Sequence, residues 1–138
     1  MSDLEQKRSS VRAWIDIAEQ DLSVVRMVLA AEPPLLTAAL FHAQQTGEKY
    51  LKAFLVWHEA SFPKTHDLKL LLELCLPFDA TLIALRPACF GLSELAVEPR
   101  YPMPPPPIGL PETQQAEADA VLIRDALRGR LEEVLGEE

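Results

Sequence analysis

The sequence predicts an all-α protein: an antiparallel up-and-down helical bundle of four long helices plus one short helix. Three observations support this prediction. Apolar residues recur every three or four positions over several long segments, which is the spacing of one helix face. Most prolines lie between those segments rather than within them. No segment shows the alternation of apolar and polar residues that is typical of a strand.

The composition is that of one ordinary globular domain over residues 1–138, because 49% of the residues are hydrophobic and 25% are charged. The net charge of −8 disfavours broad attraction to nucleic acid or to an anionic membrane, so we do not expect RNA as a partner. No apolar run approaches the roughly 18 residues of a membrane span, and no signal peptide is evident. We therefore expect a cytoplasmic protein.

The first helix is expected over about 9–31, before Pro33 and Pro34. Its apolar residues are spaced as in a bundle seam and are Val11, Ile15, Ala18, Leu22, Val25 and Leu29. Asp21 lies at the edge of that seam. The pattern favours a solvated position at the rim, and if Asp21 is buried it needs a cation or several hydrogen-bond donors.

The second helix, over 36–57, organises the chain, since it contains no proline and a single glycine. Its apolar face contains Leu36, Ala39, Leu40, Ala43, Tyr50, Leu51 and Phe54, and its polar face contains Gln45, Glu48, Lys49 and Lys52. The polar face is interpreted as solvated surface, with a functional surface as the alternative. Gln44 lies within the apolar face and needs a hydrogen-bond partner, for which Glu48 is within reach. Phe41 and Val56 lie among the polar residues and indicate a second contact surface, such as a dimer interface.

The rest of the chain contains three further helical segments. Thr65 is expected to cap a short helix over 67–76, with His66 and Asp67 in its first turn as part of the cap or of a site. A fourth helix is expected over 79–97, with a kink or a late start at Pro87. The proline-rich segment 98–112 is expected to be a stiff loop. A fifth helix should follow from Thr113 and end at Gly136.

Metal and enzyme motifs are not found in the sequence. Its histidines, His42, His58 and His66, show no H-x-x-x-H spacing, and Cys75 and Cys89 form no C-x-x-C motif. Both cysteines are interpreted as core thiols. Because a glycine-rich phosphate loop and a nucleophile motif are also missing, we expect no metal, no cofactor and no catalytic residue.

Several separate motifs together resemble the HEPN domain. They read WIDIAEQDL, then FHAQQTGEKYLKAFLV, then FPKTHDLKLLL, then EPRYP, and they extend over most of the chain. In HEPN ribonucleases an arginine is followed, after four to six residues, by a histidine, and the two act on the RNA backbone. No arginine of this sequence has a histidine at that distance. The resemblance therefore favours the non-catalytic small prokaryotic HEPN proteins and a chain without enzymatic activity.

That resemblance implies a homodimer that binds a nucleotide and acts with a minimal nucleotidyltransferase, as in a toxin–antitoxin-like pair. The nucleotide-binding residues would be Lys49, Lys52, Arg100 and Tyr101, the polar cluster would be Asp21, Gln44, Glu48, His66 and Asp67, and the dimer interface would include Phe41 and Val56. Arg100 and Tyr101 have an alternative role, which is to attach the proline-rich loop to the second helix. Two other functions are left open: a divergent HEPN ribonuclease toxin, and a purely structural assembly module.

Overall fold

The computed structural model of the chain describes residues 2–94 and 108–136, and within those ranges it contains helices and no strand. The elements in chain order are α1 (Asp3–Leu29), α2 (Leu36–Trp57), α3 (Leu68–Cys75), the 3-10 helix η1 (Ala80–Leu85), α4 (Arg86–Glu94) and α5 (Leu110–Leu135). The prediction of an all-α bundle is therefore confirmed.

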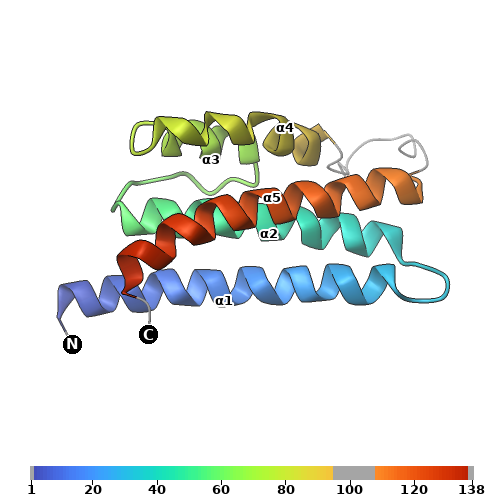
Figure 1. The fold of residues 1–138 in the computed structure, drawn as a ribbon, viewed down its shortest axis with the longest axis horizontal. Helices are drawn as coiled ribbons and strands as arrows, with labels where there is room; N and C mark the ends of the chain where they lie inside the picture. Colours follow the sequence, from blue (N-terminus) through green and yellow to red (C-terminus); the bar gives the residue numbers. More distant parts are fainter. Residues whose placement is uncertain (1, 95–107, 137–138) are drawn as a thin grey trace.

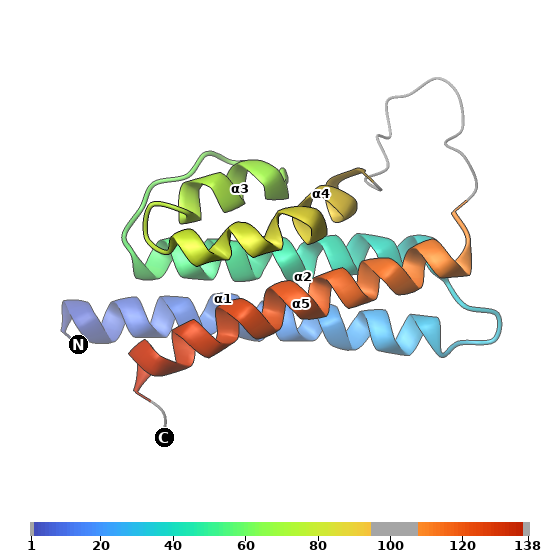
Figure 2. The same ribbon diagram turned by 45° about the horizontal axis from the view of Figure 1, so that its top comes forward.

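Helix α2 lies at the centre of the bundle and packs against α1, α3, α4 and α5. Figure 1 shows α1, α2 and α5 along the long axis, with α1 running opposite to the other two. Helices α3 and α4 form a second layer over α2, and Figure 2 shows this layer from a second direction. The chain therefore encloses α2 on several sides, which determines the surroundings of its polar residues.

The core follows the apolar stripes of α1, α2 and α5. The predicted seam of α1 is confirmed, since Val11, Ala18, Leu22 and Val25 are fully buried. The buried apolar residues of α2 are Ala39, Leu40, Ala43, Tyr50, Leu51, Ala53, Phe54 and Leu55, and those of α5 are Ala116, Ala120, Ile123, Leu127, Leu131 and Leu135. These three stripes follow the amphipathic periodicity of their helices, and buried residues of α3, η1 and α4 complete the core.

Two helices begin earlier than predicted, because hydrogen bonds from the N-cap backbone to the first-turn glutamate, which is Glu5 in α1 and Glu112 in α5, were overlooked. Helix α1 begins at Asp3 and not near residue 9, since the Ser2 hydroxyl accepts a hydrogen bond from the Glu5 amide at 3.1 Å and Ser2 N donates to the Glu5 carboxylate at 2.9 Å. Helix α5 begins at Leu110 with a proline in its first turn. It ends at Gly136, whose φ of 73° is left-handed, as predicted.

The start of α3 corrects a second prediction. Asp67, and not Thr65, caps this helix, because the Asp67 carboxylate accepts hydrogen bonds from the amides of Lys69 at 2.9 Å and Leu70 at 3.4 Å. Thr65 instead accepts a hydrogen bond from the Asp67 amide at 3.1 Å. The fourth predicted helix, over 79–97, is divided in the structure. The 3-10 helix η1 comes first, and the α-helix α4 starts late, at Arg86, directly before Pro87.

The described residues contain two buried free thiols and no metal cluster. Cys75 and Cys89 are core thiols, as interpreted, and burial raises the pKa of each to about 12. Across 2–94 and 108–136, no three His, Cys, Asp or Glu side chains are grouped so as to hold a metal ion. In the same ranges no helix is both long enough and apolar enough to cross a membrane.

Candidate functional site

The polar face of α2 is largely covered by other parts of the chain. Glu48 and Lys52 are only 3% and 8% exposed, so the interpretation of this face as solvated surface is wrong for both residues. The segment between α2 and α3 runs back along α2 (Figure 1). The Lys52 ammonium lies 5.8 Å from the ring centroid of Phe62 in that segment and 5.8 Å from the ring centroid of Trp14 in α1. The ammonium of this lysine therefore lies near two aromatic rings.

Glu48 is the centre of the polar cluster on this face. One carboxylate oxygen accepts a hydrogen bond from the Lys52 ammonium at 2.8 Å, and the other accepts one from His66 Nδ1 at 2.9 Å. The amide of Gln45 lies at 3.5 Å and adds a weak third contact. Because a carboxylate only accepts, His66 must carry a proton on Nδ1, and its imidazole is 84% exposed. A buried carboxylate therefore orients an imidazole at the surface.

A cleft of about 370 Å³ opens beside Glu48 between α2, the start of α3 and α4. The lining residues are Gln44, Gln45, Glu48, His66, Asp67, Leu68, Lys69, Leu92 and Ser93. Its volume is at the lower end of the roughly 300–1,000 Å³ of small-molecule sites. Four members of the predicted polar cluster, at positions 44, 48, 66 and 67, are thus brought together by the fold.

Helix α4 contributes to the cleft through a hydrogen bond to Gln44 and through Ser93. Gln44 donates a hydrogen bond from its side-chain nitrogen to the backbone carbonyl of Leu92 at 2.7 Å, so its predicted partnership with Glu48 is wrong. The hydroxyl oxygen of Ser93 is buried and has no hydrogen-bond partner among the described residues. A buried hydroxyl without a partner is costly, and it lines the same cleft. Ser93 was not predicted, because a lone serine near a helix end has no distinguishing sequence pattern.

Asp21 lies apart from the cleft, in the contact between α1 and α2. It is 7% exposed, so its predicted position at a solvated rim is wrong. The Lys49 ammonium donates to one Asp21 oxygen at 2.7 Å, and His42 Nδ1 donates to the other at 2.7 Å. A buried Asp21 was predicted to need a cation or several hydrogen-bond donors, and Lys49 and His42 supply them.

The ion pairs of Lys49 and Lys52 bear on the prediction that these residues bind phosphate. Each ammonium is already within 2.8 Å of a carboxylate that is at most 7% exposed. A phosphate would either displace that carboxylate or lie beside it. Breaking a buried pair costs about 3–5 kcal/mol, whereas one charge-assisted hydrogen bond contributes about 1.5–3 kcal/mol. Phosphate binding by these lysines stays a prediction. It would require an existing ion pair to break or rearrange, which is energetically unfavourable.

The remaining predicted site residues are Arg100 and Tyr101, for nucleotide binding, and Phe41 and Val56, for the dimer interface. Arg100 and Tyr101 lie outside the described residues. Phe41 is 53% exposed on α2, with its ring edge-on to the ring of His42 at 5.1 Å. Val56 is partly buried and packs against the core. Dimer formation through Phe41 and Val56 stays a prediction.

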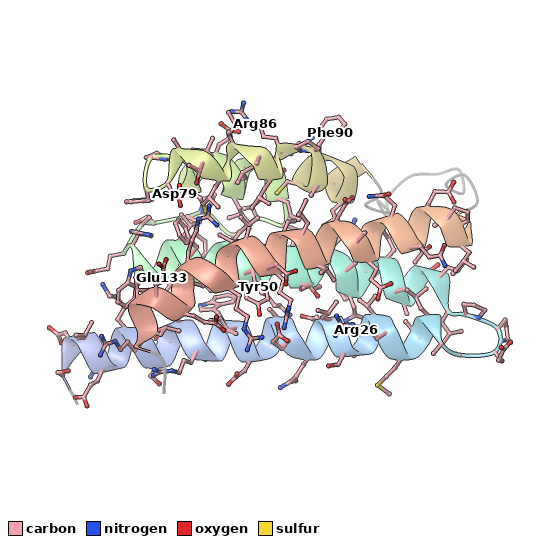
Figure 3. All side chains as sticks on the ribbon, viewed as in Figure 1. Arg26, Tyr50, Asp79, Arg86, Phe90 and Glu133 are labelled. Carbon is pink, nitrogen blue, oxygen red and sulfur yellow. The ribbon has the colours of Figure 1, made fainter. Side chains whose placement is uncertain are left out.

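A polar network between α1, α2 and α5 was missed by sequence reasoning. Figure 3 labels Tyr50, which lies between these helices. Its hydroxyl donates to the Glu19 carboxylate, which also accepts from Arg124 Nε at 2.6 Å and lies 3.3 Å from Arg128 Nη1. The available signal was that a buried tyrosine needs a partner for its hydroxyl.

This network raises the pKa of Tyr50 and lowers the pKa of Glu19. Burial, the hydrogen bond to Glu19 and the charge of Glu19 raise the pKa of Tyr50 above its ordinary value. Burial alone would raise the pKa of Glu19, but the hydrogen bonds from Arg124 and Tyr50 and the arginine charges lower it overall. The carboxylate is therefore held ionised, and the network joins three helices.

Comparison with known protein families is consistent with the helical fold and the motifs along α1, α2 and α3. The family model described as HEPN domain matches residues 11–128. The chain belongs to the HEPN family. Neither a curated protein nor a solved structure matches the chain significantly.

Proposed function

We propose that this HEPN protein is a non-catalytic nucleotide-binding protein and that the cleft beside Glu48 takes the nucleotide. The observation that supports this most directly is the convergence of polar side chains from α2, α3 and α4 on one cleft of about 370 Å³. Ser93 also lines this cleft, and its buried hydroxyl lacks a partner among the described residues. Convergent polar groups in a concave site are the usual features of small-molecule recognition.

The non-catalytic part of the proposal is based on the sequence. No arginine is followed after four to six residues by a histidine, so the chain lacks the motif of HEPN ribonucleases. The net charge of −8 also opposes tight binding of a long polyanion such as RNA. A small ligand makes fewer phosphate contacts and is less affected by this charge.

The partner part of the proposal is a homodimer acting with a minimal nucleotidyltransferase, and its support is the HEPN resemblance together with the exposed Phe41 on α2. We expect the chain, co-expressed with a nucleotidyltransferase encoded beside it, to elute with that protein as one complex. Separate elution of the two proteins at micromolar concentration would count against the pairing.

Calorimetry with ribonucleoside triphosphates tests nucleotide binding. Gln45 lines the cleft and makes only a weak hydrogen bond at 3.5 Å, so Gln45→Trp should block the cleft without unfolding the protein. We expect the wild type to bind and Gln45→Trp to lose at least about tenfold in affinity, equivalent to about 1.4 kcal/mol. The matched control is Gln114→Trp, at an exposed position of α5. No wild-type binding at millimolar nucleotide, or equal affinity in Gln45→Trp, would refute the proposal.

A second candidate function is RNA cleavage by a rearranged site, and the hydrogen bond between His66 and Glu48 favours it. With Nδ1 held by a buried carboxylate, Nε2 is the nitrogen that would exchange a proton with a substrate. RNA cleavage by the pure protein that disappears in His66→Ala would replace the non-catalytic proposal. Intact RNA after prolonged incubation with both proteins would exclude this candidate.

A further inference from the structure

The end of a nucleotide that enters the cleft can be inferred from the charges of the cleft, and this inference rests on the function proposed above. The buried Glu48 adds no net charge, because the Lys52 ammonium pairs with it at 2.8 Å. Asp67, the cap of α3, and the ammonium of Lys69 line the cleft with one charge of each sign. The lining residues from α4 carry no titratable side chain. The charge state of His66 therefore decides the net charge of the cleft.

His66 can bring a positive charge to the mouth of the cleft. Its Nδ1 donates to Glu48 at 2.9 Å, and its imidazole is 84% exposed, which leaves Nε2 without a hydrogen-bond partner in the described part of the chain. Histidine changes its charge between about pH 5 and 8, and in the charged form both ring nitrogens donate. A second proton on Nε2 would give the cleft one net positive charge. An anion bound there would balance that charge and favour the second proton.

Two other hydrogen-bond donors line the same cleft. The Lys69 ammonium lies 5.0 Å from the ring centroid of Phe90, and an ammonium has several N–H groups, so it can contact this ring and also donate to a ligand. The side-chain nitrogen of Gln45 makes only a long contact of 3.5 Å with Glu48, so it can turn to a ligand at little cost. Donors from α2, from the segment before α3 and from α3 itself thus surround one cleft.

We propose that the cleft holds the phosphate end of a nucleotide through the side chains of Gln45, His66 and Lys69, and that the base lies outside the cleft. Charge-assisted hydrogen bonds from the imidazolium and the ammonium provide most of the affinity. His66 takes up a proton as the phosphate binds. Lys49 and Lys52 retain their buried carboxylates, so no existing ion pair of these two lysines has to break.

Calorimetry with ligands that differ in their phosphates tests which end of the nucleotide is held. The probes are ATP and UTP, the nucleosides adenosine and uridine, and inorganic tripolyphosphate. We expect the two triphosphates to bind within about threefold of each other, and each nucleoside to bind at least about tenfold more weakly than its triphosphate. Tripolyphosphate should compete with ATP, because it carries the phosphate groups without a base.

Substitutions at exposed positions identify the contacts. His66→Gln can still donate to Glu48 but cannot become positively charged, and Lys69→Gln removes the ammonium. Each substitution should weaken ATP binding by at least about fivefold near neutral pH. The matched control is Lys64→Gln, which removes the same charge from an exposed position that does not line the cleft, and it should change the affinity by less than about twofold.

The uptake of a proton by His66 is measured by ATP titrations at about pH 6 and about pH 8. ATP itself and the other histidines also titrate in this range, so the wild type is compared with His66→Gln under each condition. We expect the ratio of the wild-type affinity to the variant affinity to rise at least about threefold from the higher to the lower pH.

The outcomes separate the inference from the proposed function. Nucleosides that bind as tightly as their triphosphates overturn the inference and leave the proposed function standing. An ATP affinity that is unchanged in His66→Gln or in Lys69→Gln has the same consequence, as does an equal loss in Lys64→Gln. A constant affinity ratio at the two pH values overturns the role of the His66 proton. Absence of binding by every nucleotide at millimolar concentration overturns both proposals.

Discussion

Asp21 and Glu48 are carboxylates that the fold buries, and each of them is paired with a lysine of α2. Asp21 accepts from Lys49 at 2.7 Å, and Glu48 accepts from Lys52 at 2.8 Å. Each carboxylate also accepts from a histidine ring nitrogen. A buried carboxylate is tolerated when its charge and its hydrogen bonds are both compensated. These pairs therefore explain how charged residues occupy the covered face of α2.

Asp21→Asn should lower the free energy of unfolding by about 1–3 kcal/mol, since it leaves the Lys49 ammonium without its carboxylate. The cost is less than for a fully buried pair because the Lys49 side chain is 20% exposed and can reach water. Urea denaturation measures the change. Asp16→Asn, at an exposed position of α1, is the control and should change the free energy by less than about 0.5 kcal/mol. Equal effects of the two substitutions would show that the pair contributes nothing.

His58 should make stability depend on pH near neutrality. Burial lowers the pKa of His58, and the charge of Lys7 lowers it further, while Asp79 acts in the opposite direction. The ring stacks on Phe78 with a centroid distance of 4.5 Å. Between the lowered pKa and the unfolded value of about 6.5, the unfolded chain binds more protons, so the free energy of unfolding falls as pH falls through this window.

The measurement for His58 is urea denaturation at several pH values from about 7.5 to 5.5. His58→Phe retains an aromatic ring in the stack with Phe54 and Phe78 and removes the titrating group. We expect a shallower loss of stability with falling pH in this variant. An identical pH profile in the two proteins would assign the dependence to other groups.

At the scale of elements, α2 can pack closely against three helices because its one glycine faces them. A Cβ added at Gly47 would lie 2.9 Å from Leu68 Cδ2 in α3, 3.2 Å from Ile123 Cδ1 in α5 and 3.4 Å from Leu92 Cδ1 in α4. Glycine costs helix stability in a helix interior, so its presence here is explained by close approach. Gly47 thus lies where α3, α4 and α5 approach α2 most closely among the glycine positions of the described residues.

Gly47→Val should lower the free energy of unfolding by about 1–3 kcal/mol, because the added methyl groups overpack the contact. Thermal and urea denaturation measure the effect. Gly129→Val on α5 is the matched control, since nothing lies within 4 Å of a Cβ at that position. There the change should be near zero or slightly stabilising, because glycine is the poorer helix former. A Gly47 variant as stable as the control would mean that α3 moves away at little cost.

At the scale of the whole molecule, large apolar side chains are exposed on several helices, and Phe41 on α2 is one of them. It is 53% exposed and lies on the same helix as the buried ion pairs. Leu122 on α5 is similarly exposed at 51%. Exposure alone does not identify an interface, so the predicted dimer needs a test that compares two faces.

Phe41→Glu should weaken the dimer without unfolding the protomer, since its side chain is already half exposed and a charge is costly only in an interface. Analytical ultracentrifugation at micromolar concentration measures the association, and circular dichroism verifies the fold. Leu122→Glu should leave the association unchanged. A wild-type protein that sediments as a monomer, or an equal effect of both substitutions, would contradict an interface at Phe41.

Local patterns were sufficient for most of the helices. The bounds of α2 were predicted to the residue, and the core stripes of α1 and α5 follow directly from their periodicity. Errors at helix ends came from local signals that were present but misread. The pair of Ser2 and Glu5 is a capping box, and Asp67 is as good a cap as Thr65. Such signals act over three or four residues and can be found without a structure.

The sequence by itself determined the all-α class, the amphipathic stripes and the absence of the arginine–histidine motif, because periodicity and motif spacing are properties of neighbouring residues. Only the tertiary structure decided that Glu48 and Lys52 are buried, that Asp21 is paired with Lys49, and that the cleft forms. The burial of a polar residue depends on which other element covers it. For α2, those elements are the segment before α3 and the helices α1 and α4, whose positions are set by packing across the whole chain.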